Sequence, residues 1–190
     1  MANSETNLSP PLQAQRLTAF SPIAGDNATR LILGSMPGIK SLEASHYYAH
    51  PRNLFWPVLA EVLRHPGLLT TTTGTSDALF QHRYTAIKAA GLALWDVLRH
   101  CERPGSLDSA IRPESITCND FQHFFDQHPK IEHVLLNGKT AEKLFKRHVL
   151  PELSPTLPLQ LHALPSTSPA NASIPRQQKL DAWHAALTIN

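Results

Sequence analysis

The feature that most constrains the fold is an alternation of short apolar runs with longer segments of helical periodicity. The runs predicted to form buried strands lie at 30–34, 92–97, 133–136 and 159–164. A helical segment follows each of them, and such alternation predicts right-handed crossovers and a parallel sheet covered by helices on both faces. Ligands of such sheets bind beyond the carboxyl ends of the strands.

The helical segments are recognised by apolar residues that recur every three or four positions. They are predicted at 54–63, ending before Pro66; at 76–90, ending at Gly91; around Phe121, Phe124 and Phe125, capped near Thr117 or Asn119; after Gly138, with Ala141, Leu144, Phe145 and His148 on one face; and after Pro175, with Leu180, Trp183 and Leu187 facing inward. A long loop is expected after Gly34, and the Thr-rich stretch 70–75 is expected to be a surface loop.

The chain has the size of one domain and the composition of a protein with a hydrophobic core. It has 190 residues, of which 42% are hydrophobic and 17% charged. We expect residues 1–16 to be a flexible N-terminal tail and residues 17–190 to form a single domain. The formal net charge of +2 is too small for nucleic-acid binding by bulk electrostatics alone, so any such contact must be local.

Cysteine, histidine and terminal patterns exclude several classes of protein. The two cysteines, Cys101 and Cys118, cannot form a four-thiolate metal or iron-sulfur site and do not suggest a disulfide scaffold. The histidines form no HExxH pattern, so we expect neither a metal nor another cofactor. The sequence has no secretory signal and no apolar stretch long enough for a membrane span, which predicts a cytoplasmic protein of the bacterial cytosol or nucleoid.

Polar and glycine-rich segments follow all four predicted strands and are expected to line one crevice. They are 34–38, 95–96, 137–140 and 164–171. The segment Asn137–Gly–Lys–Thr140 is similar to part of a P-loop, but His133 stands where that motif needs a glycine, which argues against a nucleoside-triphosphate site. The simpler interpretation is that Asn137 and Thr140 cap the following helix.

Two neighbouring segments, LGSMPGIKSL at 33–42 and HYYAHPRNLFW at 46–56, resemble the first motif of the uracil-DNA glycosylase superfamily. They are most similar to the DNA-deoxyinosine (hypoxanthine-DNA) glycosylase branch, near the mismatch-specific uracil/thymine-DNA glycosylases. With 91–104, 134–147 and 164–172, the resemblance covers about residues 27–188. It implies a three-layer α/β/α fold with a four-stranded parallel central sheet, and hydrolysis of the bond between a flipped-out damaged base and deoxyribose.

The resemblance assigns roles to residues of this first motif. It implies that Asn53 is catalytic and orients water or steadies the departing base, and that Tyr48 stacks on the extruded base. Ser35, Met36 and Pro37 are expected to bind the base, through backbone N–H groups of the first two and through the walls that Met36 and Pro37 provide.

Three features of this motif leave alternatives open. Asn53 precedes a predicted helix and could simply cap it, and Tyr47 with Tyr48 could simply pack a loop. Met36 occupies the position of an asparagine that holds the attacking water in the mismatch-specific relatives, so that role has either moved to Asn53 or been lost.

The segment LPSTSPA at 164–170 resembles the second motif of the family, a serine/proline loop that grips phosphates and carries the wedge that fills the gap left by the flipped base. Ser166, Thr167, Ser168, Ala170 and the nearby Lys139 are therefore expected to bind DNA. Leu164 replaces the histidine of uracil-specific enzymes, which argues against chemistry restricted to uracil. The alternative is a plain turn before a helix.

Asp96, at the end of the second predicted strand, is the remaining candidate for binding the base edge. As an ionised carboxylate it would accept a hydrogen bond from N1–H of hypoxanthine or N3–H of uracil and would repel the lone pair at N1 of adenine. The alternative is that Asp96 forms a structural ion pair with Arg99 or Arg103.

These assignments predict a monofunctional enzyme that performs simple hydrolysis without strand cleavage, because Lys40, Lys88 and Lys139 are not compelling Schiff-base nucleophiles. The expected partner is DNA with a deaminated base, hypoxanthine first, and the expected state is a monomer that does not contact membranes. The alternatives are a mismatch-type uracil-DNA glycosylase and a catalytically weak lesion-binding protein.

Overall fold

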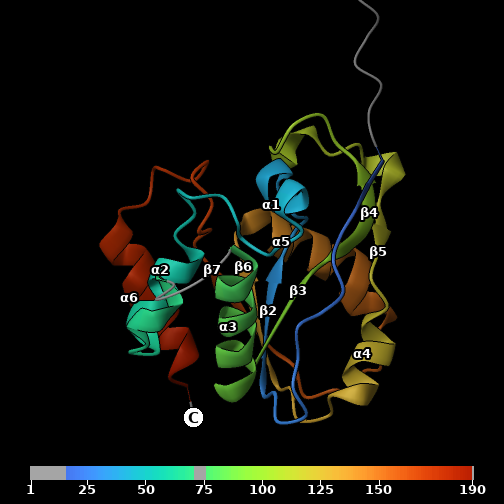
Figure 1. Cartoon of the computed structure of the whole chain (residues 1–190). Coiled ribbons are helices and arrows are strands. Elements are labelled where there is room, and N and C mark those ends of the chain that lie inside the picture. Colours follow the sequence, from blue (N-terminus) through green and yellow to red (C-terminus); the bar gives the residue numbers. More distant parts are fainter. Residues whose placement is uncertain (1–15, 71–75, 190) are drawn as a thin grey trace, which may run out of the picture.

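A four-stranded parallel sheet forms the centre of the protein, as the sequence predicts (Figure 1). The computed structural model describes residues 16–70 and 76–189. The strands are β2 (Arg30–Gly34), β3 (Leu92–Asp96), β6 (His133–Asn137) and β7 (Gln160–Leu164), in the order β3-β2-β6-β7. All three neighbouring pairs are parallel.

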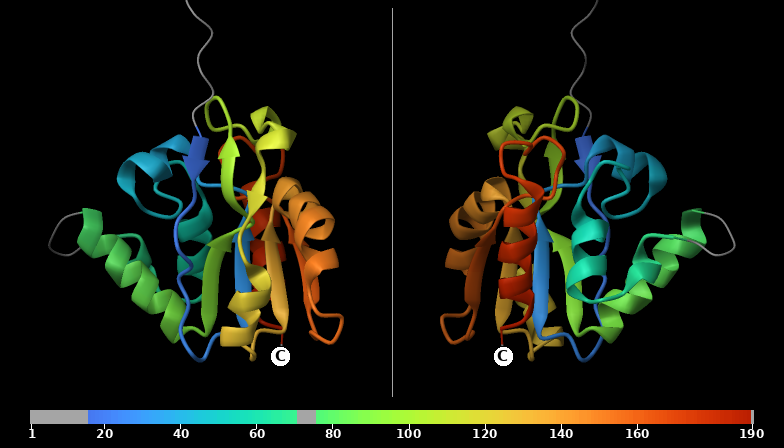
Figure 2. Two further views of the ribbon diagram at one scale, coloured as in Figure 1. Left: turned by 90° about the vertical axis from the view of Figure 1, so that its right-hand side faces the viewer. Right: turned by 90° about the vertical axis from the view of Figure 1, so that its left-hand side faces the viewer.

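Helices cover both faces of this sheet (Figures 1 and 2). On one face lie α2 (Phe55–Val62), α3 (Ser76–Ala89) and α6 (Arg176–Leu187); on the other lie α4 (Phe121–Gln127) and α5 (Lys139–Leu144). The short 3₁₀ helices are η1 (Pro66–Leu68), η2 (Asp108–Ala110), η3 (Pro113–Ser115) and η5 (Leu150–Glu152). The three-layer α/β/α prediction is confirmed.

The strand order places a topological switch between β2 and β6. From β2 the chain continues to β3 on one side, whereas from β6 it continues to β7 on the other. The two connections therefore diverge above the carboxyl ends of β2 and β6, which is where doubly wound sheets open a crevice for ligands.

A second sheet was absent from the sequence prediction. It is antiparallel, with the order β1-β4-β5, and consists of β1 (Arg16–Thr18), β4 (Leu98–Glu102) and β5 (Thr117–Cys118). Arg16 pairs with Glu102, so it belongs to this sheet and not to the predicted tail. The rest of that tail, residues 1–15, and residues 71–75 of the predicted Thr-rich loop lie outside the described residues.

Three helical details also differ from the prediction. The segment predicted as a long loop after Gly34 contains α1 (Ile39–Ala44). Asp120, and not Thr117 or Asn119, caps α4, because its carboxylate accepts from the His123 N–H. The predicted helix after Gly138 ends in a π-helical turn, η4 (Phe145–Val149), whose wider turn buries Val149 in place of His148.

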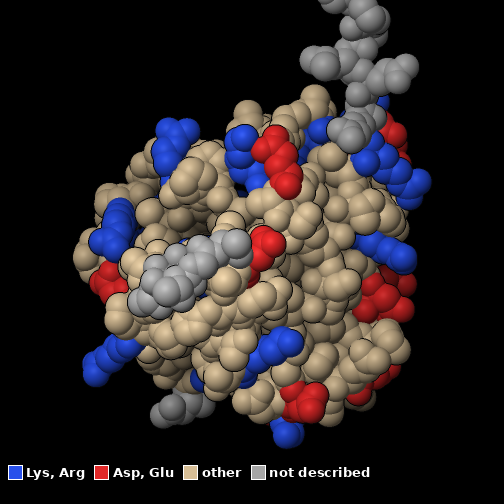
Figure 3. Space-filling model, in the orientation of Figure 1, with Lys and Arg blue, Asp and Glu red and all other residues tan. Residues whose placement is uncertain are grey.

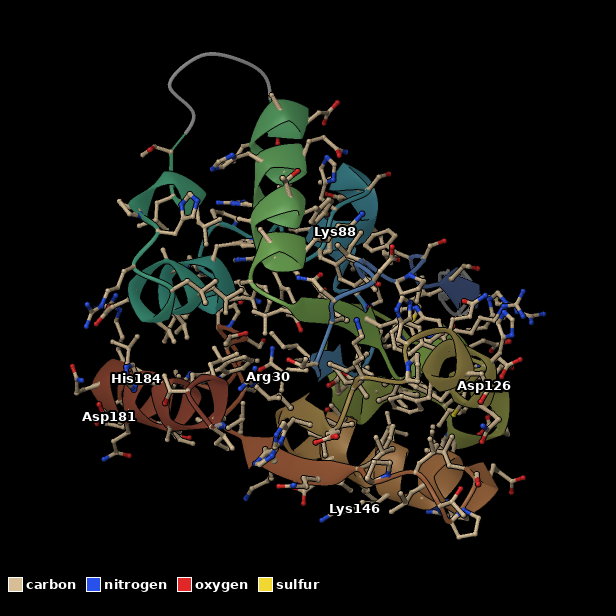
Figure 4. All side chains as sticks on the ribbon, turned by 90° about the horizontal axis from the view of Figure 1, so that it is seen from below. Arg30, Lys88, Asp126, Lys146, Asp181 and His184 are labelled. Carbon is tan, nitrogen blue, oxygen red and sulfur yellow. The ribbon has the colours of Figure 1, made fainter. Side chains whose placement is uncertain are left out.

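The core lies between the sheet and its helices, and its largest fully buried side chains include Trp183, Phe55 and Phe145. Leu180 and Trp183 of α6 face inward as predicted, whereas Leu187 is only half-buried. At the end of the sheet away from the crevice, Arg30 donates to the carbonyl oxygen of Ile189, which ties the start of β2 to the C-terminal segment (Figure 4). In the described residues, no helix combines the length and apolar character that a membrane crossing requires.

Candidate functional site

A cleft of about 900 Å³ opens at the carboxyl edge of the parallel sheet, above the switch point. The segments after all four strands contribute to its lining, together with residues of the 47–53 segment. All the residues that the sequence analysis proposed for binding or catalysis lie in this lining: Ser35, Met36, Pro37, Tyr48, Asn53, Asp96, Lys139, Ser166, Thr167, Ser168 and Ala170. Figure 3 shows that the upper part of one face, where this edge of the sheet lies, carries several Lys and Arg side chains.

Asn137, the last residue of β6, connects the parts of the cleft. Its amide nitrogen donates to the Tyr48 hydroxyl and to Thr167 Oγ1, at 3.0 Å each, and its amide oxygen accepts from the Thr167 N–H at 2.9 Å. The interpretation of Asn137 as a helix cap is wrong, since Gly138 holds the cap position of α5 and no side chain caps that helix. The sequence analysis missed this role, for which an Asn-Gly pair at the end of a buried strand is the only local signal.

Thr167 is fully buried and holds the serine loop, residues 165–171, in place. Besides its two bonds to Asn137, its carbonyl accepts from the Leu54 N–H at 3.0 Å, just before α2 begins. A side chain with no exposed surface cannot be reached by a phosphate group without a rearrangement of the loop. The structure therefore argues against the predicted DNA contact of this side chain and gives it a positioning role.

The other hydroxyls of the serine loop are more accessible. Ser166 Oγ accepts from the Ser168 N–H at 3.2 Å, and Ser168 Oγ accepts from the Ala170 N–H at 3.3 Å. Because each oxygen is used as an acceptor, each hydroxyl hydrogen is left to donate to another group. Two side chains of α6 also hold the loop by hydrogen bonds. Trp183 Nε1 donates to the Pro165 carbonyl oxygen, and Lys179 Nζ donates to the Asn171 carbonyl oxygen.

Tyr48 has a left-handed backbone, with φ of 53°, and its ring stacks on Phe55 with centroids 3.8 Å apart. One face of the ring is thus covered by the core, while the residue lines the cleft and its hydroxyl is held by Asn137. Burial and the nearby Asp96 raise the pKa of Tyr48, which keeps the phenol neutral. The simple packing role applies to Tyr47, which is buried and donates to the Ser21 carbonyl.

The Asp96 carboxyl group is buried and lines the cleft. It is only 3% exposed, and among the described residues its buried Oδ2 has no hydrogen-bond partner. Burial, reinforced by the charge of Asp108 and opposed by that of Arg103, raises its pKa to about 8. A pKa of about 8 favours the neutral form at pH 7, which argues against the expected ionised state.

The alternative of an ion pair with Arg99 or Arg103 is also wrong within the described residues. Arg103 pairs with Asp108 at 3.4 Å, and no ion pair reaches Asp96. Close approach to Gly34 explains the position of the carboxyl group, because a Cβ there would lie 2.3 Å from Asp96 Oδ1 and 3.0 Å from the Tyr48 hydroxyl. Gly34 is thus required for the space between β2 and β3 at this edge.

The first loop, residues 35–38, is held from the opposite side of the cleft. Ser35 Oγ donates to Asp108 Oδ2 at 2.6 Å, and the buried Arg103 donates to the Pro37 carbonyl at 2.6 Å. Among the described residues, the Met36 N–H has no hydrogen-bond acceptor, and its side chain is buried in the wall of the cleft. The predicted backbone donor is thus structurally available at Met36, whereas the Ser35 hydroxyl is already engaged.

Asn53 supports the start of α2 and also lines the cleft, although Leu54 and not Asn53 holds the cap position of that helix. Its Oδ1 accepts from the Phe55 N–H at 2.9 Å, which supports the start of α2. This bond fixes the orientation of the amide, because only the oxygen can accept. The amide nitrogen has no partner among the described residues, and Asn53 lines the cleft, so the free group is a hydrogen-bond donor.

Within the part of the chain that the structure describes, no three His, Cys, Asp or Glu side chains are grouped so that they could hold a metal ion. The groups in the cleft lining that remain available to a bound base include the Asn53 amide nitrogen, the Asp96 carboxyl, hydroxyls and backbone N–H groups. Such a set can bind a flat polar ring by its edge and stabilise negative charge that develops on it.

Comparison with known proteins places this arrangement in a family. The family model described as Uracil DNA glycosylase superfamily matches residues 22–187. The chain is similar to a protein named hypoxanthine DNA glycosylase from Methanosarcina barkeri (strain Fusaro), with 35% identity over 64% of this chain and 71% of that protein. It is also similar to one of the same name from Methanosarcina acetivorans, with 28% identity over 87% of this chain and 94% of that protein.

A solved structure shows the same fold. It is the solution NMR structure of a protein from Methanosarcina acetivorans described as a candidate uracil DNA glycosylase. It superimposes with a TM-score of 0.73 and 25% identity, and the match covers 91% of this chain and 97% of that one.

The raised pKa of Asp96 predicts a pH-dependent stability that Asp96→Asn removes. The folded protein holds this proton more tightly than the unfolded chain, so the stabilisation is complete below the ordinary pKa of 3.8 and is lost as the pH rises through about 8. Across that window the wild type should lose up to about 1.4 kcal/mol per pH unit relative to Asp96→Asn.

Urea unfolding of both proteins between about pH 5 and about pH 8 measures this difference. Asp26→Asn is the control, because Asp26 is exposed. A stability difference between wild type and Asp96→Asn that does not vary with pH would contradict the raised pKa.

Proposed function

The chain belongs to the uracil-DNA glycosylase superfamily. We propose that it is a monofunctional DNA glycosylase of base excision repair that releases deaminated bases and prefers hypoxanthine. The observation that carries the class of base is the buried Asp96 carboxyl, whose Oδ2 has no hydrogen-bond partner among the described residues. The names of the two relatives from Methanosarcina support hypoxanthine among the deaminated bases.

A neutral Asp96 matches the edge of hypoxanthine. That base presents a donor at N1–H beside an acceptor at O6, and a neutral carboxyl presents an acceptor beside a donor. As the glycosidic bond breaks, negative charge accumulates on the base, and an O–H donor stabilises it where a carboxylate would repel it. This role replaces the expected ionised acceptor.

Charge repulsion then no longer explains rejection of adenine, because a neutral carboxyl can also pair with that base. We propose instead that adenine is rejected at the step in which the nucleotide is flipped out of the duplex. Extrusion of adenine from an intact base pair costs more free energy than extrusion of a mispaired hypoxanthine, so hypoxanthine enters the pocket more readily.

Asn53 is the proposed catalytic residue, and its amide nitrogen and amide oxygen have different roles. The amide nitrogen donates to the departing base, while the oxygen, which already accepts from the Phe55 N–H, has a second lone pair for the attacking water. This arrangement supplies the group that Met36 cannot. Tyr48 and the Met36 N–H would hold the flipped ring, with Met36 and Pro37 as its walls.

The grip on DNA is proposed for the serine loop and the adjacent helix start. The hydroxyl hydrogens of Ser166 and Ser168 and the exposed Lys139 can donate to phosphate oxygens. Ala170 is exposed at the tip of the same loop, where its backbone can approach the strand. These contacts suit a protein of low net charge.

Base release from defined duplexes tests this function. The protein is incubated with otherwise identical duplexes that contain one hypoxanthine, one uracil or only normal bases, and abasic sites are then cleaved with alkali. We expect release of hypoxanthine in preference to uracil, and none from the undamaged duplex. Release of uracil alone would instead indicate a mismatch-type uracil-DNA glycosylase, and tight binding without release would indicate a lesion-binding protein.

Asn53→Asp separates catalysis from the structural hydrogen bond that Asn53 accepts at the start of α2. An aspartate oxygen can still accept from the Phe55 N–H, so stability should stay near that of the wild type, but the donor is lost. We expect release of hypoxanthine to fall by about 100-fold or more, the scale of one positioned catalytic group. Asn53→Ala, the comparison variant, should lose the same activity and also about 1 kcal/mol of stability. Nearly normal release by Asn53→Asp would reduce Asn53 to that structural role.

Asp96→Asn tests the protonation state that binds the base. The amide keeps an acceptor beside a donor but does not titrate. The variant should therefore release hypoxanthine at a rate that does not change with pH through titration at position 96. In the wild type, single-turnover release should fall as the pH rises through about 8. If wild-type release increases through the same range while the variant stays flat, the ionised form is the active one.

A further inference from the structure

One large apolar side chain on the rim of the cleft has no structural explanation. Leu107 is 57% exposed and lines the cleft. The other large apolar side chains that are exposed in the described residues, Ile39, Leu69 and Leu150, are not part of the cleft lining.

The loop that carries Leu107 is fixed on both sides of it. Ser106 Oγ accepts from the Ile39 N–H at 3.0 Å, and Asp108 accepts from Ser35 at 2.6 Å. Arg103, whose side chain is fully buried, donates to the carbonyl oxygens of Gly105 and Pro37. A buried arginine and two side-chain hydrogen bonds thus hold a leucine out in water, at the same end of the molecule as the serine loop (Figures 1 and 2).

The serine loop lacks a comparable side chain at its tip. Its partly or fully accessible apolar and hydroxyl members, Pro165, Ser166, Ser168, Pro169 and Ala170, are all shorter than leucine, Asn171 is polar, and Thr167 is buried. Ile174 lies further along the chain and lines the cleft, but it is half-buried. An apolar group long enough to enter a base stack is therefore presented from the opposite rim, by Leu107.

We propose that Leu107 enters the DNA helix and fills the space vacated by the flipped-out nucleotide. This inference rests on the proposed function. Extrusion of a nucleotide leaves a gap between the neighbouring bases, and apolar side chains that enter such gaps keep the steps unstacked. Insertion also removes an exposed leucine from water, which favours the complex in which the base is extruded.

The test compares Leu107→Ala with the wild type on a duplex that has 2-aminopurine beside the hypoxanthine. Unstacking of 2-aminopurine increases its fluorescence, so rapid mixing reports insertion before the base is released. We expect Leu107→Ala to lose most of this signal and to release hypoxanthine about 10- to 100-fold more slowly, the factor that corresponds to burial of one leucine side chain. Leu107→Met, which retains length and apolar character, should restore both.

Three controls make the result specific. Leu150→Ala removes an exposed leucine outside the cleft and should behave like the wild type. Unfolding by urea should show unchanged stability of Leu107→Ala, since the side chain is exposed. Ile174→Ala tests the competing position.

The inference is overturned if Leu107→Ala gives normal fluorescence and normal release, or if Ile174→Ala and not Leu107→Ala loses both. Those outcomes leave the proposed function intact, because the wild type still releases the base. Failure of the wild type to release any base overturns the proposed function, and this inference with it.

Discussion

The architecture of the cleft depends on the amide group of Asn137. The switch point brings the end of β6 beside the end of β2, and from there one side chain bonds to Tyr48 and twice to Thr167. Through Tyr48 it fixes the aromatic ring that stacks on Phe55, and through Thr167 it fixes the serine loop. The neighbouring Gly138, with φ of 103°, allows this approach, because a Cβ there would lie 2.8 Å from Ser166 Cβ.

Around this fixed frame, two side-chain groups that line the cleft lack a hydrogen-bond partner among the described residues. They are the buried Oδ2 of Asp96 and the amide nitrogen of Asn53. Burial of an unpaired polar group costs stability, which is accepted most readily where a ligand later supplies the missing partner. The proton on Asp96 lowers that cost, because a neutral carboxyl is much easier to bury than a charged one. The same proton gives the site a donor for a base that gains negative charge.

The sequence was sufficient for the parallel sheet and most helices, because their apolar periodicity is local. It was insufficient for β1, β4 and β5, which are short and pair with partners distant in the chain, as Arg16 does with Glu102. The cleft residues at the strand ends were predictable because carboxyl ends of parallel strands meet at one edge, whereas Tyr48 and Asn53 were predicted only by the resemblance to the family. The burial, hydrogen bonds and pKa values of these residues were not predictable. The burial of Thr167 and the three bonds of Asn137 depend on contacts between distant segments, and the raised pKa of Asp96 depends on its burial and on Asp108.

The central claim is that the cleft presents a protonated carboxyl to the base, and carbon-13 NMR of aspartate-labelled protein tests it most directly. The side-chain carboxyl resonances are followed with pH in the wild type and in Asp96→Asn. We expect one resonance that titrates with a midpoint of about pH 8 and is missing from the variant. If every aspartate resonance of the wild type titrates near the ordinary aspartate pKa, Asp96 is ionised at neutral pH and the account of base recognition is wrong.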